Sequence, residues 1–151
     1  MALILAVIAI VISIEAAAIV YFQLNIARST LKLGLYKRRF NIYASVVNLY
    51  VAAKKGSYDD MEKAAIPFVL SFRESRFLFD DKDDIYKMIE KIEKAYASIA
   101  GYEKIKTDNA DAESLSAHHC ESVKGHAIFD ETLPVLEDNL IKYIDFRKIK
   151  L

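Results

Sequence analysis

Cysteine, proline and glycine are all scarce in this chain of 151 residues. Because Cys120 is the only cysteine, no disulfide can form within the chain, and nothing indicates an oxidising compartment. Two prolines and four glycines supply too few turn signals for a β protein with many short strands, so long helices are favoured. The length is sufficient for one domain with a hydrophobic core.

Motifs for catalysis and cofactor binding are also missing. The glycines are isolated from one another, which excludes a glycine-rich phosphate loop, and neither a Glu-x-x-His motif nor a nucleophile elbow occurs. His118, His119 and Cys120, with His126 nearby, are the one cluster of metal-ligand types, but a second Cys pair or an HExxH motif is lacking. We therefore expect a protein that is not an enzyme and that holds no cofactor or metal.

Charge is absent from the first 14 residues, and acidic residues are absent from 16–58. Seven Lys or Arg fall in that second segment, whereas 59–151 holds 14 basic and 20 acidic residues. The formal net charge of zero therefore hides a basic first third, which we expect to pack against the acidic remainder. Aromatic residues among the basic ones recur at helix-packing spacing, so we expect no nucleic-acid partner.

The first 22 residues form the longest apolar run, in which Ser13 and Glu15 are the only polar residues. At 1.5 Å per residue, a helix of this length spans about 33 Å, the thickness of a bilayer's hydrocarbon core. A cleaved signal peptide needs a basic start and small residues at its cleavage site, but this run ends in the bulky "IVYF". We predict a transmembrane anchor over 1–23 and a helical cytosolic domain over 24–151; the buried helix of a soluble protein is the alternative.

Basic residues follow the predicted span, and none precedes it. Five of them lie within about 20 residues of its end: Arg28, Lys32, Lys37, Arg38 and Arg39. The positive-inside rule then predicts a bacterial inner-membrane protein with its N-terminus outside and its C-terminal domain in the cytoplasm. We expect the same basic residues to contact anionic membrane lipid.

Small residues recur along one side of the predicted span at spacings of three and four: Ala2, Ala6, Ala9, Ser13 and Ala16. Such a seam lets two membrane helices approach closely, so it predicts a homo-oligomer or a membrane protein partner. At about 100° per residue, Glu15 lies nearly opposite the seam. Three interpretations of Glu15 stay open: a neutral carboxyl tolerated in lipid, a contact with a second membrane partner or protomer, or a role in proton or ion movement.

Helical periodicity covers most of the remaining chain. After the span, one apolar stripe continues with little or no break toward a stop at Gly56: Leu31, Leu35, Ile42, Val46 and Leu49. Ser57 and Asp60 resemble a capping box for a helix over about 58–79, and the acidic run at 80–84 is expected to cap a third helix. The expected fold class is all-α: a transmembrane helix that continues into a cytosolic bundle of four to five helices.

Glycines and prolines predict where these helices end or break. Pro67 is expected to kink or break the second helix, and Gly101 to cap the third, with a loop over 102–112. The last helical region, over about 111–148, is expected to bend or divide at Gly125 and Pro134, with a fresh start near Thr132.

Three short patches carry a resemblance to a known group of proteins. "LKLGLYKRRFNIYASVVNL", residues 31–49, is similar to a stretch in uncharacterised bacterial single-pass membrane proteins with a short helical cytosolic domain. Those proteins carry a Leu-x-Leu-Tyr/Phe-x-x-Arg-Phe/Tyr-x-Ile/Val-Tyr pattern after their anchor. "ESRFLF" at 74–79 and "YIDFRKI" at 143–149 resemble the same group. The resemblance implies an anchored helical protein and no particular activity.

These patterns favour protein–protein interaction as the function. The chain is expected to scaffold or regulate a partner at the bacterial inner membrane. The competing interpretation is an oligomerising membrane-active effector, of the toxin or defence type, whose spans perturb the bilayer. An enzyme or sensor with a small ligand between its helices is a third and weaker interpretation.

Overall fold

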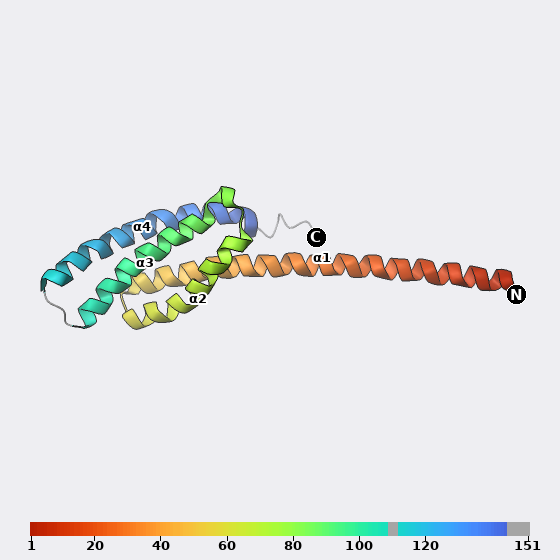
Figure 1. The fold of residues 1–151 in the computed structure, drawn as a ribbon, viewed down its shortest axis with the longest axis horizontal. Coiled ribbons are helices and arrows are strands. Elements are labelled where there is room, and N and C mark those ends of the chain that lie inside the picture. The colour runs from red at the N-terminus through yellow and green to blue at the C-terminus, as the bar shows by residue number, and fades with distance from the viewer. Residues whose placement is uncertain (109–111, 145–151) are drawn as a thin grey trace.

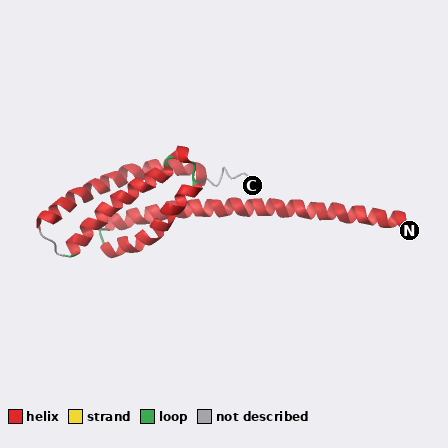
Figure 2. Cartoon of the chain, in the orientation of Figure 1, coloured by secondary structure: helices red, strands yellow, loops and turns green. Residues whose placement is uncertain are grey.

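The computed structural model describes residues 1–108 and 112–144, apart from the side chains of Ala2 and Leu5. Within these residues the chain forms four α-helices and one short 3-10 helix, and no strand occurs (Figures 1 and 2). The expected all-α fold class is confirmed: a long apolar helix at the N-terminus leads directly into a helical bundle.

Helix α1, Ala2–Lys55, runs for 54 residues without interruption, a length of about 80 Å. It contains no proline, and it ends where predicted, at Gly56, whose φ of 71° is a left-handed conformation that glycine adopts readily. Figure 1 shows its N-terminal part projecting far beyond the other helices. None of the described side chains before Ile42 is buried.

The C-terminal part of α1 forms a four-helix bundle with α2 (Tyr58–Leu78), α3 (Ile85–Thr107) and α4 (Ala112–Ile144). The 3-10 turn η1, Asp81–Asp83, connects α2 to α3. The largest contact is between α3 and α4, and α1 packs chiefly on α2. The apolar side chains at the centre come from all four helices: Ile42, Val46, Leu49, Met61, Phe68, Ile85, Ile89, Ile92, Ile99, Phe129, Leu136 and Leu140.

The bundle covers only part of the apolar stripe predicted on α1. Ile42, Val46 and Leu49 are fully buried, whereas Leu31 and Leu35 are exposed because they precede the bundle. This apolar face of α1 is therefore buried in the core of the bundle at its C-terminal end and exposed before the bundle begins.

Several predicted helix breaks are wrong. Helix α3 passes Gly101 and continues to Thr107, so most of the expected loop is helix. Helix α4 runs undivided through Gly125 and Pro134, with Thr132 in its interior, and Pro67 does not break α2. The other alternative at these positions, a kink or bend without a break, stays a prediction. Each proline removes one backbone hydrogen bond, but core residues in the same helix hold it in place. Residues 109–111 and the expected end of the last helix at 148 lie outside the described residues.

Candidate functional site

Helix α1 is, within the described part of the chain, the one helix long and apolar enough to cross a membrane. Its most apolar window is not buried at all. Isoleucine, valine and phenylalanine side chains left in water along such a length would form an apolar surface that soluble monomers rarely carry. The N-terminal part of α1 is thus a candidate membrane span, and the boundary of the anchor at residue 23 stays a prediction.

The small-residue seam lies on the same side of α1 as the bundle. In an α-helix, 36 residues make about ten full turns, so residues 36 apart share one face. By this spacing Ala6, Ala9, Ser13 and Ala16 align with four buried residues: Ile42, Ser45, Leu49 and Ala52. The hydroxyl of Ser13 donates to the carbonyl of Ala9 at 2.8 Å, which satisfies it within the helix. The side chain of Ala2 lies outside the described residues.

The five basic residues after the span separate into two groups. Arg28, Lys32 and Lys37 have exposed side chains on the stretch of α1 before the bundle. Arg38 instead reaches α2, where its Nη1 lies 3.4 Å from Oε1 of Glu74. Arg38 and Arg39 therefore contact the bundle, and the contact of the five basic residues with anionic lipid stays a prediction.

Arg39 joins three elements where α1 enters the bundle. Its Nε donates to the backbone carbonyl of Leu78 at the end of α2, at 3.0 Å. Its guanidinium carbon lies 4.7 Å from the ring centroid of Tyr143 on α4 and 5.9 Å from that of Phe79. Because a guanidinium is attracted to aromatic faces at this range, Arg39 fixes the position of α1 relative to α2 and α4.

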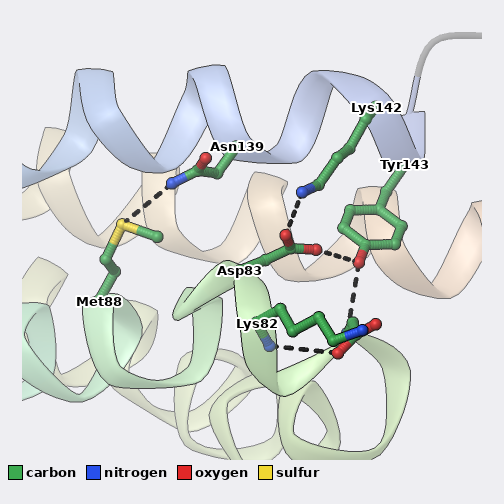
Figure 3. Close-up of polar contacts among 7 residues, drawn as sticks. Lys82, Asp83, Met88, Asn139, Lys142 and Tyr143 are labelled. Atoms are coloured by element: carbon green, nitrogen blue, oxygen red, sulfur yellow. Dashed lines mark hydrogen bonds and ion pairs between the residues drawn. The ribbon is translucent and has the colours of Figure 1, made fainter.

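A second group of polar contacts links η1 to the end of α4, as Figure 3 shows. Asp83 accepts hydrogen bonds from Nζ of Lys142 and from the hydroxyl of Tyr143, which itself accepts from the backbone N–H of Asp80 at 3.3 Å. These bonds hold the pKa of the Asp83 carboxyl below its usual value and raise the pKa of Lys142. Burial raises the pKa of Tyr143. The acidic run was expected to cap α3, but the N-cap residue of α3, Asp84, makes no side-chain capping hydrogen bond. The run binds α4 instead, through Asp80 and Asp83.

Polar side chains also fix α1 against α4 further along the bundle. The hydroxyl of Tyr43 donates to Oε1 of Glu137 at 2.9 Å, and the hydroxyl of Tyr50 donates to Oδ1 of Asp130 at 3.0 Å. Lys54 donates to the other oxygen of Asp130 at 2.8 Å, which lowers the pKa of that carboxyl. The predicted contact between the basic helix and acidic ones is present here.

Helix α2 carries a second, uncovered apolar face. Met61, Phe68 and Ser75 are buried against the bundle. On the opposite side, Ile66, Leu70 and Phe77 are 68%, 67% and 83% exposed. Arg73, also exposed, lies between them, and we call these four residues the outward face of α2. Sequence reasoning missed this surface, although two apolar stripes on one helix were a signal that could have revealed it.

The histidine and cysteine cluster does not converge on a point. Within the described residues, no group of three His, Cys, Asp or Glu side chains could hold a metal ion. The ring of His119 packs 5.2 Å from that of Tyr102, and Cys120 is exposed. Burial and the nearby Lys54 ammonium lower the pKa of His126.

A cavity of about 300 Å³ lies between the end of α2 and the start of α3. Its lining is mostly polar or charged: Ser75, Arg76, Phe79, Asp80, Asp81, Asp84, Ile85, Tyr86 and Lys87. The hydroxyl of Ser75 donates to the backbone carbonyl of Phe72 at 2.6 Å rather than to one of the carboxylates that line the cavity. No family model matches the chain, and no match was found among curated proteins or solved structures.

Proposed function

We propose that this chain is a membrane-anchored helical assembly protein that scaffolds or regulates a protein partner at the bacterial inner membrane. The N-terminal part of α1 anchors it with the N-terminus outside, and the bundle lies on the cytoplasmic side. The observation that carries the proposal is the unbroken α1, which joins an apolar, uncovered segment to a folded bundle. A continuous helix holds the bundle at a fixed distance from the bilayer, as a scaffold requires.

The outward face of α2 is the surface on the bundle that suits a partner. Large apolar side chains at the centre of an interface supply most of its binding energy when water is excluded from them. Ile66, Leu70 and Phe77 are such side chains, and Arg73 adds a guanidinium that a partner's carboxylate can pair with. The expected partner therefore presents an apolar patch with an acidic residue.

A photo-crosslinking amino acid at Leu70 tests this surface in living cells. We expect it to link the protein to a discrete partner in the membrane fraction, and Phe77→Ser to abolish that product. A crosslinker at Lys91, exposed on α3, is the matched control and should give none. If Leu70 and Lys91 gave the same products, or if Phe77→Ser had no effect, the outward face of α2 would not be the binding surface.

The second candidate function, a membrane-active effector, is favoured by one observation. Glu15 is an exposed carboxyl in the most apolar part of α1, where oligomerised spans could turn it toward a water-filled path. Expression of the wild type should then inhibit growth or cause ion leakage, and Glu15→Gln should remove the effect. A wild type without toxicity would eliminate this candidate.

A further inference from the structure

One side of α1 carries exposed large apolar side chains at intervals from its N-terminal part into the bundle. Within the bundle, Phe40 and Val51 are both 43% exposed although neighbouring positions on the other side are fully buried. Toward the N-terminus the same side continues as exposed large apolar residues. We call this side the outward stripe of α1, and its members are Ile4, Ile8, Phe22, Ile26, Leu33, Phe40 and Val51.

Glu15 belongs to the outward stripe. Five turns of an α-helix take about 18 residues, and α1 is continuous from Ala2 to Lys55. Glu15, Leu33 and Val51 are spaced by 18 residues and therefore share one face. The small-residue seam aligns instead with buried residues, so Glu15 and the bundle lie on opposite sides of α1.

The two ends of the outward stripe require contacts of different chemistry. Beyond the predicted span, Leu33 and Phe40 are apolar side chains in water, which favours an apolar partner. Within the span, the carboxyl of Glu15 needs a hydrogen-bonding partner, because none is available from lipid tails. An occupant that meets both needs must follow α1 from the bilayer into the cytoplasm.

We propose that the outward stripe binds the outward stripe of a second copy of this chain, in parallel, with the two Glu15 carboxyls facing each other. A copy anchored in the same orientation presents each residue at the same depth, so a two-fold axis pairs every group with its equivalent. A carboxylic acid both donates and accepts, so two of them can hydrogen-bond inside the membrane. This inference rests on the anchoring stated in the proposed function.

The position of the bundle favours this pairing over one through the seam. With α1 helices joined by their outward stripes, each bundle lies on the far side of its own helix and the two do not collide. Parallel helices joined through Ala6, Ala9 and Ser13 would place both bundles in the same space beyond Arg38. The seam remains a predicted contact for other membrane helices.

Disulfide trapping with a matched pair of cysteines tests the proposal. In a Cys120→Ala background, Leu33→Cys places a thiol on the outward stripe, and Leu31→Cys places one on the bundle side of the same exposed stretch. On mild oxidation of membranes, Leu33→Cys should form a dimer about tenfold faster, because a disulfide needs Cβ atoms about 4 Å apart. Equal rates, a faster Leu31→Cys, or no dimer from either would overturn the proposal.

Glu15 is tested in the Leu33→Cys protein. Glu15→Leu should slow dimer trapping about fivefold, because the free energy of one interhelical hydrogen bond in a membrane corresponds to a change of about this size. Glu15→Gln should keep the wild-type trapping rate, because an amide also donates and accepts hydrogen bonds. Equal trapping in all three proteins would show that the carboxyls do not meet. Recovery of the wild type in the soluble fraction would instead refute the anchored function itself, so the two failures are distinguishable.

Discussion

Thr132 lies in the middle of α4 with its side chain buried and, within the described residues, no hydrogen-bond partner for its hydroxyl. A buried hydroxyl without a partner lowers stability by about 1–3 kcal/mol. Thr132→Val keeps the shape and removes this penalty, so it should raise the free energy of unfolding by about 1 kcal/mol. Thr132→Ser keeps the hydroxyl, loses a methyl group and should lower it by a similar amount. Urea unfolding followed by circular dichroism compares the two.

Asp83 predicts a pH dependence of stability. Hydrogen bonds from Lys142 and Tyr143 lower the pKa of its carboxyl below the usual 3.8. Its contribution is therefore complete above the pKa of the unfolded chain and is lost as pH falls through the lower folded value. Asp83→Asn should lower the thermal midpoint at neutral pH, and the difference from wild type should shrink progressively as the pH falls below 3.8. Asp81→Asn, in the same turn, is the control; an equal loss there would contradict this role for Asp83.

The contacts of Asp83 with Lys142 and Tyr143 could not be predicted from the sequence. The acidic run at 80–84 is expected to cap α3, but Asp84, the N-cap residue of α3, makes no side-chain capping hydrogen bond. Asp80 instead caps the 3-10 turn η1 by accepting a hydrogen bond from the N–H of Lys82. The role of Asp83 depends on Tyr143 and Lys142, some 60 residues away in the chain, which only the packing of α4 brings close. Periodicity places a residue on a face of its own helix but says little about which distant side chain it meets.

The length and the ends of an individual helix were predictable where nearby residues in the sequence determine them. The length of α1 and its end at Gly56 follow from an apolar run without proline and from a residue that tolerates positive φ. The expected cap at Gly101 and break at Gly125 were wrong because helix packing outweighs the weak propensity of glycine. Gly125 is buried, and a Cβ added there would lie 2.7 Å from the carbonyl oxygen of Ala95. The sequence does not show this close approach of α3 and α4.

The two glycines therefore predict opposite effects of the same substitution. Gly125→Ala would force α3 and α4 apart, because the atom it meets is backbone, and should lower the free energy of unfolding by about 2 kcal/mol. A Cβ at Gly101 meets no atom within 4 Å, so Gly101→Ala should raise it by about 1 kcal/mol through helix propensity alone. Thermal unfolding of the two variants in the same detergent is the measurement. A neutral Gly125→Ala would mean that the helices are not in this close contact.

Across the whole molecule, charged residues and exposed apolar side chains are both distributed unevenly between the bundle and the part of α1 that projects from it. The basic part of α1 pairs with the acidic helices through Arg38–Glu74 and Lys54–Asp130. Such exposed pairs add little stability, but they favour this arrangement of helices over others. Most of the large apolar side chains that the bundle leaves exposed lie on α1 and α2. The proposed self-association and the proposed partner binding each depend on one of these two exposed surfaces.

Cys120 provides a test of how the whole molecule lies in the membrane. Its thiol is exposed on α4, and the basic residues after the span predict a cytoplasmic bundle. A membrane-impermeant maleimide should therefore label Cys120 only after the inner membrane is permeabilised. In a Cys120→Ala background, Leu3→Cys should be labelled without permeabilisation, since Leu3 lies at the N-terminal end of α1 and the bundle lies at its C-terminal end. Labelling of Cys120 in intact spheroplasts, with Leu3→Cys protected, would reverse the orientation and place the bundle outside the cell.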